Sequence, residues 1–221
     1  MTGTIQLLGA NVFTQNYDLV RDRFIRDAAG NLTALDIRWI NTGGTITKGI
    51  EFGLKADASL GEGKLSGGFD LSYLLDKRTR LISNSPWGAE EINQFTRSGD
   101  LGLRWKHTAF VSYRRGHWSA TVNQLYRNGY VDAVLPGVAA GIVHPANWNP
   151  MVKAYDIFGL SVTYRGFKNL TVTAGIKNLF NTPPPFSAVY DTTTGAGSDW
   201  EPRVADPRDR SFTTRVDYNF R

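Results

Sequence analysis

The chain has 221 residues, of which 25 are Lys or Arg and 20 are Asp or Glu, and its formal net charge is +5. Cysteine is absent, which excludes a disulfide framework and a thiolate metal site. The basic residues form no long run of the kind found in nucleic-acid-binding tails, and no stretch approaches the roughly 18 consecutive apolar residues of a membrane-spanning helix. The segment after Met1 lacks the features of a secretory signal. If the chain belongs to the cell envelope, we therefore expect it to be a piece of something longer.

Residues 1–45 show the weakest pattern. Two strands are predicted here, with a hairpin turn at residues 27–31 between them. Their apolar positions are Ile5, Leu7, Phe13 and Tyr17 in the first strand and Leu35, Ile37 and Trp39 in the second.

From residue 46 the sequence predicts three hairpins of long strands, over residues 46–76, 102–132 and 154–180. In each hairpin, apolar and polar residues alternate on both sides of a short turn, which indicates strands with one apolar and one polar face. The first strand, from Ile46 to Leu60, is well beyond the usual length of about five or six residues. A further strand is predicted over residues 210–220, with Phe212, Val216, Tyr218 and Phe220 on its apolar side.

The connections between these strands differ in length. The hairpin turns are short, whereas residues 77–101, 132–153 and 181–209 are long and rich in Pro, Gly, Trp and charged residues. Because alternate connections of an antiparallel meander emerge at opposite ends, all the long loops lie at one end. Outer-membrane barrels have this asymmetry. We therefore predict an all-β fold, an antiparallel transmembrane β-barrel of about eight long strands, with residues 1–221 as one barrel segment.

The spacing of aromatic residues favours lipid as the surroundings of the apolar face. Trp118 and Tyr130 lie twelve residues apart in one predicted strand, a rise of about 28 Å at a tilt of about 45°. The apolar band of such barrels is about 25 Å tall, with an aromatic girdle at each edge. The residues expected in the girdles are Tyr113, Trp118, Tyr126, Tyr130, Tyr164 and Phe220. The alternative is that these are core aromatics at strand ends.

Two ionisable residues conflict with a lipid-facing surface. His107 and Asp156 fall on the predicted lipid face, where ionisable groups are costly at depth. Either both are tolerated, with His107 neutral and Asp156 near the long-loop end, or a bulge shifts the strand parity locally.

Three short motifs resemble one family. The run Gly175 to Asn181, followed by three prolines at 183–185, resembles the penultimate strand of TonB-dependent receptors. Residues 47–51 look like the Arg-Gly-Ile/Val-Glu entry into a strand of that family, and residues 206–212 look like its Pro-Arg-Thr/Ser-Phe approach to the last strand. The three motifs occur in the family's order, and the resemblance covers residues 1 to 220.

The resemblance implies the C-terminal part of an outer-membrane barrel of about 22 strands around an N-terminal plug. The plug, the segment that engages TonB and the earlier strands have no counterpart in this sequence. The implied partners are outer-membrane lipid, the missing strands and plug of the parent receptor, the TonB complex through that parent, and the barrel-assembly machinery. The resemblance also implies that Phe212, Val216, Tyr218 and Phe220 form the assembly signal, although Arg221 follows where the family usually stops at an aromatic residue.

Catalysis has little support in the sequence. The three histidines, His107, His117 and His144, show no metal-binding spacing and no nucleophile motif. We therefore predict that the protein is not an enzyme and needs no cofactor or metal, and that nucleic acid is not a partner.

The better functional candidates lie in the long loops, because the resemblance implies that ligand contacts come from external loops and the plug. Flat aromatic faces beside polar groups suit sugars or aromatic chelates. The candidates are Trp87, Glu90, Arg97, His144, Trp148, Tyr190, Asp199, Trp200 and Arg203, with Glu91, Asp191 and Glu201 nearby. The alternative is that Trp and charge at loop bases form girdle and solvated surface.

The function predicted for the parent is to bind and import a scarce solute of the siderophore, vitamin or oligosaccharide class across the cell outer membrane. Two alternatives remain. One is a small closed eight-stranded membrane barrel with a structural or adhesion role, in which the strand from Ile5 to Tyr17 pairs with the last strand. The other is a soluble lipocalin-like binder with a core of Phe69, Leu71, Val111 and Val162.

Overall fold

A computed structural model describes residues 5–6, 10–41, 43–80, 85–96, 100–134, 136–142, 144, 149–190 and 197–220. Leu7 and Arg221, which carry predictions made from the sequence, lie outside these ranges. Neither helix that the structure describes, α1 (Ala10–Gln15) or α2 (Pro136–Ala139), is long and apolar enough to cross a lipid bilayer.

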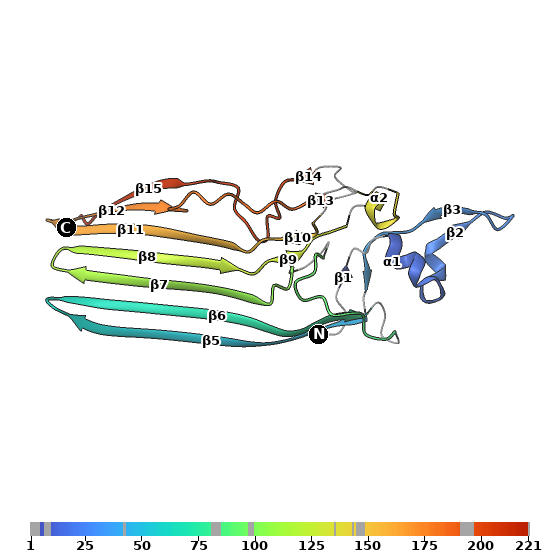
Figure 1. Ribbon diagram of the computed structural model, residues 1–221, viewed down its shortest axis with the longest axis horizontal. Coiled ribbons are helices and arrows are strands. Elements are labelled where there is room, and N and C mark those ends of the chain that lie inside the picture. The colour runs from blue at the N-terminus through green and yellow to red at the C-terminus, as the bar shows by residue number, and fades with distance from the viewer. Residues whose placement is uncertain are drawn as a thin grey trace.

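One antiparallel sheet of seven strands, which we call the wall, dominates the structure (Figure 1). In their order across the wall, the strands are β15 (Ser211–Tyr218), β12 (Leu170–Lys177), β11 (Tyr155–Phe167), β8 (Trp118–Arg127), β7 (Trp105–Arg115), β6 (Gly63–Arg80) and β5 (Gly44–Leu60). The predicted all-β antiparallel fold is confirmed.

The wall strands keep strict alternation over most of their length. The register places Ala56, Gly67, Val111 and Val122 in one row across β5 to β8, with apolar side chains on one face of the wall. A row of Ser and Thr residues lies next to it on the other face, where the Thr121 hydroxyl donates to Ser112 Oγ at 2.9 Å. We call these surfaces the apolar face and the polar face.

The two ends of the wall differ as the loop lengths predict. The β5–β6, β7–β8 and β11–β12 turns lie at one end, and the long connections gather at the other (Figure 1). Gly61 and Gly116 make the first two turns with φ of 56° and 54°, a conformation that favours glycine. The long connections carry two short strand pairs, β9 (Tyr130–Val131) with β10 (Met151–Val152) and β13 (Val189–Tyr190) with β14 (Gly197–Ser198).

The first segment differs from its prediction. The strand expected from Ile5 to Tyr17 is wrong from Ala10 onward, because helix α1 and a short 3-10 helix, Tyr17–Leu19, replace it, and a second 3-10 helix, Arg21–Arg23, follows. The second strand, expected at Leu35, Ile37 and Trp39, is wrong beyond Leu35, where the strand ends. A small local core explains the difference, since Phe13, Val20 and Ile40 are buried against one another and override a weak strand pattern.

The turn expected at residues 27–31 is confirmed. It joins β2 (Phe24–Arg26) to β3 (Leu32–Leu35), and the Asp27 carboxylate accepts hydrogen bonds from the backbone N–H groups of Ala29 and Asn31 at 2.9 and 2.8 Å. A two-residue pair, β1 (Ile5–Gln6) with β4 (Ile40–Asn41), lies at the base of this segment. The segment projects beyond the loop end of the wall (Figure 1).

The wall is an open sheet. Within the described residues, β5 and β15 each pair with one neighbour, so the first and last strands do not close a barrel. The small closed barrel is therefore wrong for this part of the chain. The lipocalin-like core is wrong too, because Val111 is 55% exposed and Phe69, Leu71 and Val162 are only partly buried. The main buried cluster lies instead at the loop end and consists of Leu101, Leu103, Tyr130, Val152, Tyr155, Val204 and Ala205.

Candidate functional site

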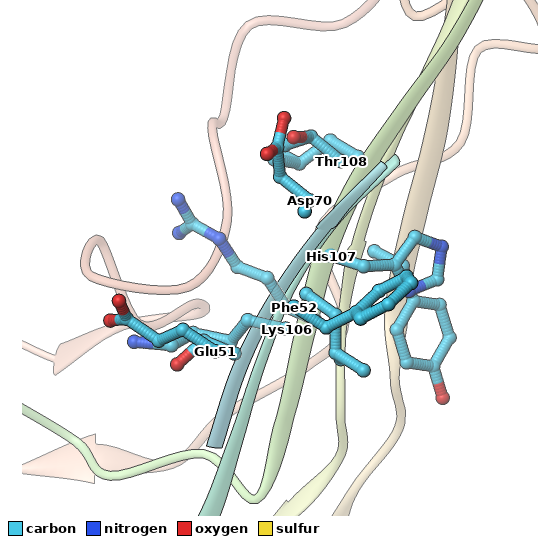
Figure 2. Close-up of a pocket in the computed structure, with 12 residues that line it drawn as sticks. Glu51, Phe52, Asp70, Lys106, His107 and Thr108 are labelled. Carbon is cyan, nitrogen blue, oxygen red and sulfur yellow. The ribbon is translucent and has the colours of Figure 1, made fainter. Parts of the chain in front are cut away.

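Near the loop end, the wall separates two chemically different surfaces. Figure 2 shows Glu51, Asp70, Lys106 and Thr108 on one side of the strands and Phe52 and His107 on the other. These residues border a hollow of about 510 Å³. Because side chains from both faces of a single sheet line it, the hollow is an open depression and not an enclosed cavity. On its polar side, Glu51, Asp70 and Lys106 give the hollow a surface of mixed charge.

The long connections pack over this end of the polar face. We call the described segments 85–96, 100–104, 128–134, 149–154, 178–190 and 197–209 the loop layer. Tyr155 of β11 lies on the polar face, is buried beneath Val204 and Ala205, and donates from its hydroxyl to the Asp206 carbonyl at 3.3 Å. The loop layer therefore has a core of its own against the wall.

A buried hydrogen-bond chain joins two parts of the loop layer. The Tyr130 hydroxyl donates to Ser187 Oγ at 3.0 Å, and the Ser187 hydroxyl donates to Asp132 Oδ1 at 3.0 Å. The other oxygen of Asp132 accepts from the Ala188 backbone N–H. Burial raises the pKa of Tyr130 to about 12, so the phenol keeps its proton and remains a donor. The chain fixes the segment after β12 against β9.

A buried ion pair anchors the segment before β15. The Arg203 guanidinium donates to both carboxylate oxygens of Glu201, at 2.8 and 2.9 Å, and to the Thr96 carbonyl at 2.8 Å. Arg127 of β8 donates to the carbonyl oxygens of Arg203 and Val204 at 2.6 and 2.8 Å. Burial alone would raise the pKa of Glu201, but the hydrogen bonds and charge of Arg203 outweigh it and hold that pKa below its usual value.

Charged residues of the wall meet the loops beside this anchor. Buried Lys77 donates from its ammonium group to the Asp100 carbonyl, and the Lys106 ammonium lies 3.7 Å from the Asp100 carboxylate. Arg104 pairs with Glu90 at 3.3 Å. The charged side chains at the loop end of the polar face are therefore paired with one another.

A second hollow, of about 570 Å³, lies within the loop layer. Its lining residues come from the segment around β10 and from the proline run after β12, and include Met151, Lys153, Pro184 and Phe186. The exposed Met151 and Phe186 side chains make it largely apolar.

The structure places the described ligand-binding candidates at the loop end, and these described residues do not share one pocket. Trp87 is exposed, with the Arg80 guanidinium 4.7 Å from its ring centroid. Glu90 is paired with Arg104, and Arg203 is committed to Glu201. Asp199 and His144 are exposed, Trp200 is partly buried, and Tyr190 lies in β13. Arg97, Trp148 and Asp191 lie outside the described residues. Their role in ligand binding stays a prediction.

The girdle candidates fall into two groups. Tyr113, Trp118, Tyr164 and Phe220 lie at the turn end of the wall, whereas Tyr126 and Tyr130 lie toward the loop end. Trp118 and Tyr164 have ring centroids 4.5 Å apart at the turn end, Tyr113 donates to the Leu60 carbonyl there, and Tyr218 lies 4.7 Å from Phe220. Tyr130 is wrongly assigned to the girdle, because it is fully buried in the loop layer. The chain leaves the wall at Asn128 and Gly129, so strand parity no longer predicts where Tyr130 points.

The two ionisable residues do lie on the apolar face. His107 pairs with Tyr126, and Tyr126 pairs with Asp156, with no register shift between β7 and β8 or between β8 and β11. A bulge that moves either residue to the other face is therefore wrong.

Three important buried polar residues were not recognised from the sequence. Asp132 and Ser187 lie in segments that looked only like irregular loop, and Lys77 looked like the start of one. Their partners are distant in sequence, so no local signal identifies them. Within the described residues, no three His, Cys, Asp or Glu side chains form a group that could hold a metal ion.

Comparison with known proteins shows which family of folds this chain resembles. The family model "TonB dependent receptor-like, beta-barrel" matches residues 3–179. A search of curated protein sequences finds no match. Among solved structures, one variant of the ferric enterobactin receptor PfeA from Pseudomonas aeruginosa has a TM-score of 0.53 and 18% sequence identity, and the match covers 82% of this chain and 23% of that one.

A second PfeA variant has a TM-score of 0.54 at 18% identity, over 86% of this chain and 25% of that one. The copper transporter OprC has a TM-score of 0.48 at 18% identity, over 82% of this chain and 24% of that one. This chain thus spans about a quarter of the length of the structures it matches. With four-fifths of its length matched by the family model, the chain belongs to the TonB-dependent receptor-like β-barrel family.

Proposed function

We propose that the chain forms part of the barrel wall and outer mouth of a TonB-dependent receptor in a bacterial outer membrane. In this proposal the parent receptor binds a scarce solute outside the cell and imports it with energy relayed by TonB. The observation that carries the proposal is an open sheet with an exposed apolar face and all its long loops at one end, in a chain of this family. The assignment of residues 1–221 to one barrel segment is part of the proposal.

The free edges of the wall support a larger barrel. The outer edge of β5 is 17 residues long, and β15 is free on one side within the described residues. In lipid each unpaired backbone group costs several kcal/mol, so both edges need neighbouring strands. Further strands of the parent receptor would supply them, around a plug that contacts the charged polar face. Assembly into the membrane would use the exposed Phe212, Val216, Tyr218 and Phe220 as the signal read by the barrel-assembly machinery.

The solute is proposed only as a member of the siderophore, vitamin or oligosaccharide class. PfeA is named for ferric enterobactin, but at 18% identity that likeness carries the fold and not the ligand. The candidates for ligand contact remain the loop residues, and among those described Trp87, beside Arg80, offers an exposed aromatic surface.

The test begins with the reading frame upstream of the codon for Met1, which should encode a plug and further alternating strands. The complete receptor is then expressed in Gram-negative hosts with and without TonB, and uptake of labelled ferric siderophores, cobalamin and oligosaccharides is measured. At least one solute should enter only in the host that has TonB. Trp87→Ala should raise the half-saturating concentration of that solute, and Trp118→Ala, at the opposite end of the wall, should not. Equal uptake in both hosts for every solute would refute the proposal.

A further inference from the structure

The apolar face carries one continuous row of polar side chains, which we call the polar row. The Trp105 indole N–H donates to His107 Nδ1 at 2.7 Å, His107 Nε2 lies 3.4 Å from Gln124 Oε1, and the Gln124 amide donates to Asp156 Oδ1 at 2.9 Å. These residues belong to β7, β8 and β11, so the hydrogen bonds run across the wall from one strand to the next.

The hydrogen bonds of the polar row have one direction. Because the Trp105 indole can only donate, His107 Nδ1 accepts, and the imidazole proton lies on Nε2, facing the Gln124 side-chain oxygen. The Gln124 amide nitrogen is left to donate to Asp156. Stacking fixes the imidazole itself, since the His107 and Tyr126 rings have centroids 5.0 Å apart and an angle of 15° between their planes. The row therefore ends on a carboxylate whose position is set before any partner binds.

The acidic end of the polar row lies within the apolar band. The Tyr126–Asp156 pair lies eight residues beyond the Trp118–Tyr164 pair along both strands. At about 3.3 Å per residue and a tilt of about 45°, that is a rise of about 19 Å in a band about 25 Å tall. Hydrocarbon offers a carboxylate neither a donor nor a cation, so Asp156 is costly there unless another polar group reaches it.

Two polar atoms at this end of the row are unused. Gln124 occupies Oδ1 of Asp156, whereas Oδ2 and the Tyr126 hydroxyl have no hydrogen-bond partner in the part of the chain that the structure describes. Asp156 also forms no ion pair with a described residue. One of the two unused groups is a donor and the other is an acceptor.

This donor and this acceptor are placed so that they complement a second copy of themselves. Tyr126 and Asp156 are direct cross-strand partners on β8 and β11, so they lie side by side at nearly the same depth. Two receptor copies in one membrane share an orientation, so a two-fold axis that relates them runs along the membrane normal. Rotation about that axis keeps depth and exchanges left for right, so that Tyr126 of each copy faces Asp156 of the other.

We propose that the polar row is a contact between two copies of the parent receptor, in which each Tyr126 hydroxyl donates to Asp156 Oδ2 of the other copy. This rests on the proposed function, because it requires the apolar face to lie in a membrane. Apolar burial does not drive association in lipid, where packing and hydrogen bonds hold transmembrane partners together. The two-fold axis gives two charge-assisted hydrogen bonds, and these satisfy both carboxylates.

The test measures association of the complete receptor in lipid vesicles. Copies carry a donor or an acceptor dye at a cysteine introduced at exposed Lys153, and energy transfer between them is followed as the protein-to-lipid ratio is lowered. The wild type should dimerise. Tyr126→Phe, which keeps the ring stack and removes both hydrogen bonds, should raise the dissociation constant about tenfold, and so should Asp156→Leu. Asp57→Asn is the matched control, because it removes the same charge from the polar face, and it should leave the dissociation constant unchanged.

A mixture of the two variants gives the sharper test. When Tyr126→Phe copies meet Asp156→Leu copies, the intact tyrosine of one faces the intact aspartate of the other, and the two substituted positions form an apolar pair. The mixed dimer should therefore be tighter than either variant alone, which a purely structural role for these residues would not produce.

A wild type that stays monomeric would overturn the contact and leave lipid as the occupant of this face. A mixed dimer no tighter than those of its component variants would overturn it as well. TonB-dependent uptake by the unlabelled receptor reports separately on the proposed function, so the two proposals can fail independently.

Discussion

The wall and the loop layer bury their apolar side chains in opposite ways. In the wall, Leu54 and Val111 are each 55% exposed in the middle of long, regular strands. In the loop layer, where the backbone is irregular, Leu101 is 1% exposed and Val204 is 2% exposed. In this chain the regular strands leave apolar side chains exposed, and the irregular loops bury them. In the proposed receptor this difference has a reason, because the wall would meet lipid and the loop layer would meet water.

Polar groups show the same contrast. On the polar face of the wall, charged side chains such as Lys55 and Asp57 are exposed and form no ion pair with any described residue. In the loop layer, Asp132 and Glu201 are buried, and each accepts several hydrogen bonds. Changes to the wall should therefore act through transfer into lipid, and changes to the loop layer through packing and hydrogen bonding.

The largest expected effect comes from placing a charge on the apolar face. Val111 lies about 9 Å above the Trp118–Tyr164 pair, well inside the apolar band. Val111→Arg in the complete receptor should cost about 2–4 kcal/mol of the free energy of unfolding. The neighbouring change Ser112→Arg, on the polar face, should cost about 1 kcal/mol, mainly from the lost hydrogen bond with Thr121. Urea unfolding in lipid vesicles measures both, and equal costs would contradict a lipid-facing surface.

The wall could be predicted from the sequence because one local rule determines it. A period of two places Phe212, Val216 and Tyr218 on one side, and the structure leaves all three exposed on the apolar face. The short turns and long loops follow from the same alternation. The rule fails where the chain leaves the sheet. Tyr130 has the parity of the lipid face, yet beyond Gly129 its direction is set by Ser187, 57 residues further along the chain.

The candidate site could be predicted only as a location. Loop length and composition indicate that functional residues lie at the loop end, and the described candidates do lie there. Which of them are free to bind depends on long-range pairing that no local pattern contains. Arg203, for example, is held by Glu201 and by the Thr96 carbonyl, 107 residues away. The segment from Ala10 to Arg23 fails for a related reason, since its small core overrides the strand pattern.

A smaller effect is expected where the two regions join. A Cβ atom at Gly129 would lie 2.5 Å from the Val152 carbonyl oxygen and 3.2 Å from the Ala154 nitrogen, so β9 and β10 would have to separate. Gly129→Ala should cost about 1–3 kcal/mol and increase hydrogen exchange in residues 149–154. Gly67→Ala is the wall control, because its Cβ would meet the Phe110 carbonyl oxygen at 3.5 Å, an ordinary contact. If Gly67→Ala is the more damaging change, the junction is not the tighter of the two sites.

The smallest effect should be a local response of the loop layer to acid. Because the folded-state pKa of Glu201 is lowered, its contribution to stability is complete above the unfolded value of 4.5 and is lost as the pH falls through the lower folded value. Hydrogen exchange of residues 200–206, corrected for the intrinsic rate, should therefore rise as the pH falls below about 4.5. Glu201→Gln should remove this dependence. Glu62→Gln is the matched control, because the Glu62–Arg115 pair is exposed at the turn end and contributes little. An unchanged acid response in Glu201→Gln would show that another group opens the loop, and would leave the ion pair as an anchor without a role in pH sensitivity.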